Sequence, residues 1–344
     1  MSNEIIYVDE NSEIPLFGVD FLGIIDRGTN VIEIKPLTLC NLKCKYCFVK
    51  AGDYTTNFII NPDYLIEKIE DIVNIKGNYK IEIHFAPYGE ILLYPNLFKL
   101  IKEIWKIKGI EIISLQSNGL LLNEDIIKKL EDAKITRINI SLNSLNPEEV
   151  NYLCNTNNYD LNNLLKSISR LLNGTIDVLL APVWFPGEND RDIEDIIKYV
   201  KDLRKRGYSE TKIQIGIQKY LVYKTGRKLK KIRPKSWGYF YKQLALLEKT
   251  YNIKLKLGPQ DFGIHKRETS ASLNVQKNDF IKLKVVSKGR WEHEYIGKTD
   301  NNFGIKVLLD QPFSQPEKFI GREIKAKIIK ANYKDNILTA IFSI

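Results

Sequence analysis

Hydrophobic residues recur with two different periods along most of this chain. From Asn30 to about Gly263, short apolar runs alternate with longer segments whose apolar residues are spaced three and four apart. The short runs are typical of buried strands, and the longer segments are typical of helices with one apolar face. The six runs that predict strands are VIEIKPL, KIEIHFA, IEIISLQS, RINISLNS, IDVLLAPVW and KIQIGIQ.

Helix-start residues fall where this alternation needs them. Asn61-Pro62, Asn123 and Asn146-Pro147 each supply a cap or a first-turn residue before a helical segment. Six β/α repeats predict a parallel sheet curled into a partial (β/α)6 barrel of the TIM type over residues 31–265. Its chemistry is expected at the C-terminal ends of its strands. Residues 1–30 are then an N-terminal extension.

The pattern changes near the C-terminus. From residue 273 onward, five short alternating runs are separated by Gly, Asn, Asp and Pro. About seventy residues in five short strands predict a small, closed all-β barrel of the oligonucleotide-binding kind. We place this second domain at residues 270–344.

No apolar run approaches the roughly 18 residues that span a bilayer. The N-terminus also lacks the basic-then-apolar order of a signal peptide. We therefore expect a cytoplasmic protein with no membrane partner, and we take it to be a monomer.

Three of the four cysteines lie within eight residues, CNLKCKYC, directly after a predicted strand. Such clustering indicates a metal site rather than a disulfide framework. The spacing lets one tight loop present Cys40, Cys44 and Cys47 to three corners of a 4Fe–4S cluster, leaving the fourth iron open. The alternative is a zinc site with His84 as the fourth ligand.

This octapeptide matches the signature C-x-x-x-C-x-aromatic-C, with Tyr46 at the aromatic position. The chain thereby resembles the radical S-adenosylmethionine (SAM) superfamily over roughly residues 30–260. The resemblance implies that SAM binds the open iron and is cleaved to a 5′-deoxyadenosyl radical, while the protein binds and orients the reactants. It also implies an electron donor such as a ferredoxin or flavodoxin.

Further likenesses to this family occur at successive strand ends. HFAPYGE resembles the Gly-Gly-Glu loop that binds the SAM amino group, although Tyr88 replaces the first glycine. QSNG is similar to the family's Thr-Asn-Gly, and SLNS to its Ser-Leu-Asp-Ser. Turns and helix caps would explain each motif singly, but their order favours the resemblance. The cofactor contacts that it implies are Tyr46, Gly89, Glu90, Ser117, Asn118, Ser141 and Asn143.

The fourth cysteine, Cys154, lies in NYLCNTNN after the fourth predicted strand. A lone cysteine is most often a small packed hydrophobic residue. The functional alternative is a catalytic thiol that carries a methyl group or quenches a radical, and Cys154 is our candidate catalytic residue.

Positive charge is concentrated in two segments of this chain, whose formal net charge is +10. Residues 198–235 contain 14 Lys or Arg against two acids, and residues 270–344 contain 13 against eight. A basic excess confined to two segments favours surfaces that meet a polyanion. Solvated helix faces in a lysine-rich protein are the alternative.

The segment KYLVYKTGRKLKKIRPKSW follows the sixth predicted strand and should lie near the barrel mouth. Its cations would neutralise phosphates there, and its aromatic side chains would stack on unpaired bases. The candidate RNA contacts are Lys219, Tyr223, Lys224, Arg227, Lys228, Lys230, Lys231 and Arg233.

The C-terminal module resembles, in strand count, size and basicity, the TRAM-type RNA-binding domain of radical enzymes that modify transfer RNA. Together with the basic segment, this predicts a transferase or related enzyme that modifies a nucleoside in structured RNA, with transfer RNA favoured. One alternative is a radical enzyme for a peptide or small metabolite, with the barrel as a partner-binding module. Another is a non-catalytic RNA-binding protein that keeps a structural cluster.

Overall fold

The computed structural model describes residues 4–269, 273–311 and 316–343. The predicted start of the C-terminal module at residue 270 lies outside the described residues. By compactness the chain divides into two units. Unit 1 comprises Met1–Leu39, Asp53–Glu111 and Ile264–Ile344, and unit 2 comprises Cys40–Gly52 and Ile112–Gly263. The predicted domain boundaries at residues 30 and 265 stay predictions.

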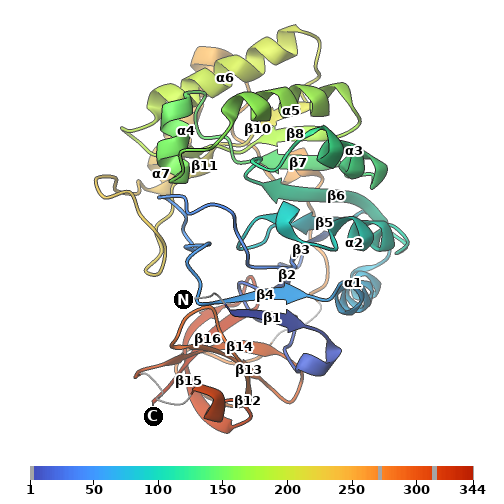
Figure 1. Cartoon of the computed structure of the whole chain (residues 1–344), viewed down its shortest axis with the longest axis vertical. Coiled ribbons are helices and arrows are strands. Elements are labelled where there is room, and N and C mark those ends of the chain that lie inside the picture. The colour runs from blue at the N-terminus through green and yellow to red at the C-terminus, as the bar shows by residue number, and fades with distance from the viewer. Residues whose placement is uncertain (1–3, 270–272, 312–315, 344) are drawn as a thin grey trace. The chain divides into compact units, whose positions relative to one another are not determined.

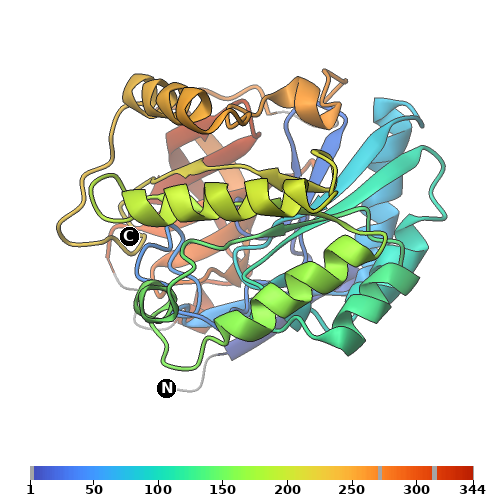
Figure 2. The ribbon, with the colours of Figure 1, turned by 90° about the horizontal axis from the view of Figure 1, so that it is seen from above.

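Parallel strands alternate with helices in unit 2. The strand order is β10-β8-β7-β6, and β9 and β11 form a further parallel pair. Helices α5 and α6 lie along β8 and β10 (Figures 1 and 2). The elements are β6 (Ile110–Ser117, beginning in unit 1), α3 (Glu124–Asp132), β7 (Arg137–Ile140), α4 (Pro147–Cys154), α5 (Leu161–Asn173), β8 (Asp177–Leu180), β9 (Val183–Trp184), α6 (Asp190–Lys205), β10 (Ile213–Ile215), β11 (Gln218–Lys219), α7 (Trp237–Tyr251) and the 3-10 turn η3 (Pro259–Phe262).

Side-chain caps start the helices of this unit where the sequence predicts them. The Asn123 side chain accepts a hydrogen bond from the Ile126 N–H at 2.9 Å, and the Asn146 side chain caps α4 before its first-turn proline. These caps satisfy backbone donors that have no partner within the helix. The apolar face of α5, which includes Leu164, Ile168 and Leu171, is buried. Full burial of each such side chain contributes roughly 1.5–3 kcal/mol.

Unit 1 contains the first β/α elements of the chain. Strands β1 and β4 pair in parallel, β2 pairs antiparallel with β3, and β3 pairs in parallel with β5. The N-terminal extension thus contributes strands of its own, which the sequence analysis did not predict. The elements are β1 (Glu4–Val8), η1 (Glu10–Ser12), β2 (Gly23–Asp26), β3 (Val31–Lys35), β4 (Thr56–Ile60), α1 (Pro62–Lys76), β5 (Ile81–Phe85), η2 (Ile91–Leu93) and α2 (Leu97–Ile104).

The C-terminal part of unit 1 is a closed five-stranded barrel with the order β12-β13-β14-β16-β15. Its neighbouring strands are antiparallel except for the parallel pair β14 and β16. Its interior is apolar and includes Val285, Tyr295, Ile305 and Ala326. The barrel strands are β12 (Phe280–Lys288), β13 (Glu294–Lys298), β14 (Gly304–Leu309), β15 (Glu323–Asn332) and β16 (Ile337–Phe342), with the 3-10 turn η4 at Pro316–Lys318.

All six predicted strands are present, and the α/β class with an additional small all-β barrel is confirmed. The last two predicted strands are each broken into two short ones. Within the described ranges of the chain, no helix is long and apolar enough to cross a membrane. The predicted cytoplasmic location and monomeric state stay predictions.

Candidate functional site

The cysteine loop, residues 40–52 of unit 2, has no helix or strand. Its three cysteines are partly exposed. Two turn hydrogen bonds shape the loop, from Cys47 N–H to the Cys44 carbonyl (3.2 Å) and from Lys50 N–H to the Cys47 carbonyl (3.1 Å). Gly52 closes it with φ of 86°, a conformation that favours glycine. The loop is therefore a compact turn that can present several thiols to one ligand.

The structure brings the fourth cysteine into the same region. Cys154, at the end of α4, is buried, and its thiol lies beside that of Cys44. The neighbouring Cys154 thiol, together with burial, raises the pKa of the Cys44 thiol well above its usual value. Burial also raises the pKa of Cys47. The catalytic role of Cys154 stays a prediction, but the residue does lie beside a candidate ligand.

Among the described residues, no three His, Cys, Asp or Glu side chains come together as a preformed metal site. The donor set of the loop nevertheless fits an iron–sulfur cluster, because thiolates are the ligands that hold such clusters in proteins. Cys40, Cys44 and Cys47 are the residues of unit 2 that could bind it.

Tyr46 and Asn143 are brought together in unit 2. The Asn143 side-chain amide donates to the Tyr46 hydroxyl, and its oxygen accepts from the Val183 N–H at 2.7 Å. The Tyr46 ring packs against Phe185 with centroids 5.0 Å apart. Burial raises the pKa of the Tyr46 hydroxyl well above its usual value, so this group stays protonated. These contacts tie the cysteine loop to the residues that follow β7 and β8.

Polar residues collect at the C-terminal ends of the paired strands β6 and β7. The Gln116 amide donates to the Ser141 hydroxyl at 2.8 Å, while the Ser117 hydroxyl accepts from the Gly119 N–H at 3.0 Å. The Asn118 amide donates to the Asn41 side chain of the cysteine loop at 2.8 Å. Four of the predicted cofactor contacts, Ser117, Asn118, Ser141 and Asn143, therefore lie at or just beyond these two strand ends. The link through Asn41 could not be predicted, because asparagine in a loop has no distinctive pattern.

The remaining predicted cofactor contacts, Gly89 and Glu90, belong to unit 1. The Glu90 N–H donates to the carbonyl of Leu39, the residue that precedes Cys40 in the chain, at 2.7 Å. A Cβ on Gly89 would lie 2.1 Å from that same carbonyl, so only glycine permits this close approach. The Glu90 side chain is buried, and one of its oxygens accepts from the Leu92 N–H at 3.0 Å.

Tyr88, which departs from the glycine of the family pattern, has a structural use of its own. Its ring lies under two cations of unit 1, with Lys35 Nζ 4.5 Å and the Arg290 guanidinium 5.7 Å from its centroid. Such contacts are favourable because the face of an aromatic ring has a negative electrostatic potential. The departure thus connects the loop of Gly89 and Glu90 to the barrel residue Arg290.

The basic segment, residues 219–235, joins β11 to α7 and contains all the predicted RNA contacts. Its apolar side chains pack with the cysteine loop: Tyr220 and Leu229 share a cluster with Phe185 and Tyr46. The Lys224, Lys228, Lys230 and Lys231 side chains are exposed. In the described part of the chain, these four lysines have no acidic partner.

Arg227 has a use that the sequence did not predict. Its guanidinium donates to the carbonyls of Cys44 and Ala51, both at 2.6 Å. Unlike the lysines around it, Arg227 is thus engaged by the cysteine loop. Its role as an RNA contact stays a prediction.

The aromatic residues around the start of α7 include Trp237, which the sequence suggested as a stacking residue, and Trp184 and Tyr239, which sequence reasoning missed. Trp184 and Tyr239 stack with centroids 6.0 Å apart, and Lys219 Nζ lies 5.0 Å from the Trp237 ring centroid. A small, shallow hollow lies here, lined by Trp184, Pro186, Lys219, Tyr220, Lys235 and Phe240. The helical spacing of the aromatics was a signal, but it equally predicts an ordinary buried face.

Residues 34–200 match the profile of the Radical SAM superfamily. The chain is 32% identical to Uncharacterized protein MJ0103 of Methanocaldococcus jannaschii, covering 97% of this chain and 80% of that protein. It is 36% identical to GTP 3',8-cyclase of Alkaliphilus metalliredigens, covering 51% of this chain and 54% of the cyclase. It therefore spans only about half the length of that cyclase.

A solved structure shares the fold. The FeFe-hydrogenase maturase HydG from Carboxydothermus hydrogenoformans superposes with a TM-score of 0.52 at 16% identity, covering 63% of this chain and 50% of HydG. At this identity the likeness concerns the fold alone. With the profile match, it confirms the predicted partial barrel.

Proposed function

This chain belongs to the radical SAM superfamily, and from that premise we propose that it modifies a nucleoside in structured RNA, with transfer RNA as the favoured substrate. Membership confirms a radical SAM enzyme and the predicted cofactors, a 4Fe–4S cluster and SAM, over the zinc alternative. An electron donor is also needed, for which a ferredoxin or flavodoxin is our proposal.

Cys40, Cys44 and Cys47 are the proposed cluster ligands. When bound, the cluster supplies the electron that cleaves SAM and so starts hydrogen abstraction from the substrate. The chain's own residues bind and orient the reactants. Glu90 is a buried carboxylate that can accept hydrogen bonds from an ammonium group, which suits the SAM amino group.

The other proposed SAM contacts divide into two groups. Ser117, Asn118 and Ser141 offer short polar side chains at strand ends, suited to hydroxyl and carboxylate groups. Tyr46 and Asn143 are joined by a hydrogen bond, which fixes the position of Tyr46 in the cysteine loop. Cys154, beside Cys44, is the one proposed catalytic thiol.

The observation that carries the RNA proposal is the placement of the exposed lysines of the basic segment, which have no acidic partner in the described ranges of the chain. The segment packs on the cysteine loop, since the rings of Tyr223 and Phe48 lie 5.6 Å apart. Its cations therefore lie close to the loop that is proposed to hold the cluster. A row of cations without acidic partners suits a phosphate backbone, and neighbouring aromatic rings suit unpaired bases. The TRAM-type character of the barrel stays a prediction.

Mass analysis of nucleosides tests this proposal directly. The anaerobically reconstituted enzyme is incubated with SAM, a reductant and transfer RNA from a strain that lacks the gene, and the RNA is digested. We expect one nucleoside of changed mass together with 5′-deoxyadenosine. A Cys47→Ala variant, which would lack a cluster ligand, serves as the negative control.

Two results would contradict the proposal. If 5′-deoxyadenosine forms but no nucleoside changes in any RNA tested, the RNA substrate is wrong while the radical chemistry stands. If RNA does not bind even at low salt, the basic segment has another partner.

A second candidate function is the modification of a small metabolite, specifically a free nucleotide. The similarity to GTP 3',8-cyclase over half of this chain favours it. Incubation with GTP in place of RNA discriminates: consumption of GTP at rates above those with RNA would favour this candidate. The barrel would then act as a partner-binding module.

A further inference from the structure

Arg227 contacts the cysteine loop at three points. Its backbone N–H donates to the Cys47 carbonyl at 2.8 Å, and its guanidinium donates to the Cys44 carbonyl and to the Ala51 carbonyl. Two of these carbonyls belong to proposed cluster ligands. One residue from a distant part of the sequence thus holds the loop at each of the last two cysteines and again at Ala51.

The backbone next to Arg227 also lies directly on the loop. A Cβ on Gly226 would lie only 2.3 Å from the Phe48 carbonyl oxygen. The two backbone segments therefore approach too closely for any residue other than glycine at this position. Gly226 in turn donates its N–H to the Tyr223 carbonyl at 3.1 Å, which turns the chain toward the loop. This arrangement delivers the Arg227 side chain to the loop carbonyls.

We propose that Arg227 is a positioning residue that fixes the cysteine loop in the shape in which it binds the cluster. The proposal rests on the assignment of Cys44 and Cys47 as ligands. Together with the turn hydrogen bonds of the loop, the bonds to Arg227 set the planes of the peptide groups beside these cysteines. Those planes determine where each Cα–Cβ bond points, and hence where each thiolate lies.

The residue type suits this role. A guanidinium is planar and always charged, and it donates in several fixed directions, so one side chain can bind two carbonyls at once. Its positive charge also lies beside thiols that become thiolates when they bind metal. A lysine would keep the charge but could not reproduce both hydrogen bonds.

Iron retention tests the proposal without any RNA. Wild type, Arg227→Ala and Arg227→Lys are reconstituted anaerobically, and the release of iron to a strong ferrous chelator is timed. Arg206→Ala is the matched control, because Arg206 is an exposed arginine that caps the C-terminal end of α6. Alkylation of the loop cysteines in the metal-free protein, followed by peptide mass analysis, reports the same positioning independently.

We expect Arg227→Ala to release iron on the order of 10-fold faster than wild type, as is typical when a residue supporting metal ligands is lost. The iron-release rate of Arg227→Lys should lie between those of wild type and Arg227→Ala, because the positive charge remains but the two guanidinium hydrogen bonds cannot both form. Alkylation of Cys44 and Cys47 should accelerate in the same order, and the reduced cluster of Arg227→Ala should show an altered electron paramagnetic resonance spectrum.

The proposal is overturned if both Arg227 variants release iron and react with the alkylating agent at the rates of Arg206→Ala. Circular dichroism checks the folding of each variant; if Arg227→Ala does not fold, Arg227→Lys decides. A Cys47→Ala protein that retains a full complement of iron would instead overturn the ligand assignment itself. None of these results depends on whether RNA is the substrate.

Discussion

The two basic regions of this chain use their charge differently. In the barrel, several cations pair with acids, many of them from the N-terminal extension: Lys284 with Glu13 at 2.6 Å and Lys306 with Asp20 at 2.8 Å. In the basic segment, the exposed lysines have no acidic partner among the described residues. Two stretches with similar numbers of Lys and Arg are thus unequal as polyanion surfaces, because paired cations have weaker fields.

A similar division occurs within the longer basic stretch. On α6, Lys198 pairs with Asp195 at 2.9 Å and Lys205 with Asp202 at 3.2 Å, both one helical turn away. The basic segment begins only after β10 and has no such acids. Counting charges from 198 to 235 therefore overstated the number of cations that are available to a polyanion.

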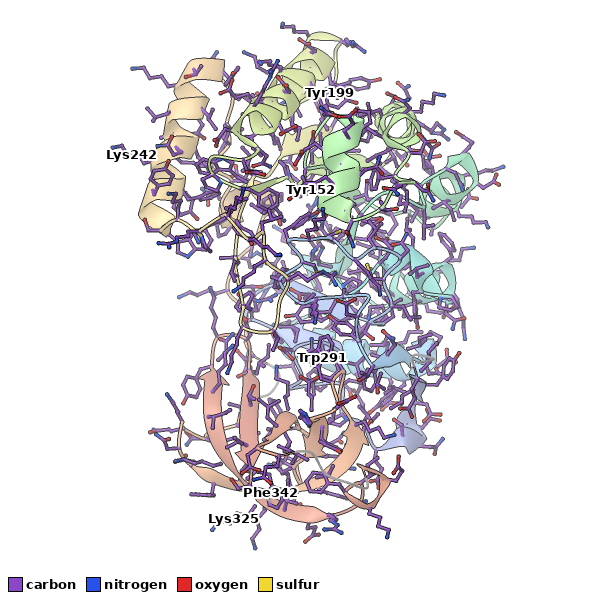
Figure 3. All side chains as sticks on the ribbon, turned by 60° about the vertical axis from the view of Figure 1, so that its left-hand side comes forward. Tyr152, Tyr199, Lys242, Trp291, Lys325 and Phe342 are labelled. Carbon is purple, nitrogen blue, oxygen red and sulfur yellow. The ribbon has the colours of Figure 1, made fainter. Side chains whose placement is uncertain are left out.

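Arg290 of the barrel is a buried cation with a structural role. It is buried, donates to both oxygens of Glu294 at 3.0 and 3.1 Å, and lies over the rings of Phe21 and Tyr54 (4.3 and 5.3 Å). Its carbonyl accepts from the Thr55 N–H at 2.9 Å. Figure 3 labels the adjacent Trp291, whose ring contacts Tyr54.

The largest expected effect is the loss of folding stability when Arg290 is replaced. Arg290→Ala would leave Glu294 buried without its partner and should lower the free energy of unfolding by about 3–5 kcal/mol. Lys284→Ala, which removes an exposed pair, should cost about 0–1 kcal/mol. Urea unfolding followed by circular dichroism measures both. Equal losses in the two variants would show that the buried pair has no special weight.

The next largest effect separates unpaired from paired lysines. Lys230→Ala/Lys231→Ala should weaken RNA binding by about 10-fold or more at low salt and reduce the salt dependence by about one phosphate contact per lysine. Lys198→Ala/Lys205→Ala removes the same charge from paired positions on α6. Filter binding across a salt series compares them, and equal losses in both double variants would break the comparison.

Acid should weaken unit 1 through one of its ion pairs. Burial raises the pKa of Glu33, but Lys35 and Arg27 lower it more, to about 2. Since its usual pKa is near 4.3, this carboxylate stabilises the fold above about pH 4.3, and the contribution is lost as pH falls toward 2. Between pH 5 and pH 3, we expect the Glu33→Gln variant to lose about 1–2 kcal/mol less unfolding free energy than wild type. An unchanged slope would argue against the pairing.

The smallest effect concerns cations of the barrel that have no acidic partner among the residues the structure describes. Lys282 and Lys325 face one another across β12 and β15, and Lys325 lies on the outer side of the barrel (Figure 3). Like charges in directly opposite positions are unfavourable, so Lys325→Glu should stabilise the protein by about 0.2–1 kcal/mol. If this face also contacts RNA, binding should weaken at the same time. Thermal unfolding and filter binding read the two effects, with Lys334→Glu as an exposed control.

Much of the site was accessible from sequence because its signals are local. Cys40, Cys44 and Cys47 lie within eight residues, and the polar strand-end motifs follow runs whose strand character is clear from composition. The helix caps at Asn123 and Asn146 were predicted for the same reason, since a cap involves residues only two or three apart. The N-terminal strands β1 and β2 were missed, because their partners are strands elsewhere in the chain.

By itself, then, the sequence determined the fold class, the family and its cofactors, and the cysteine loop proposed to bind the cluster. The tertiary structure alone decided which cations are paired, that Arg227 binds the carbonyls of the cysteine loop, and that Cys154 lies beside Cys44. The reason is physical: periodicity and motifs report interactions between near neighbours in the chain. Ion pairs, close backbone approaches and long-range hydrogen bonds join residues up to hundreds of positions apart, and only folding brings them together.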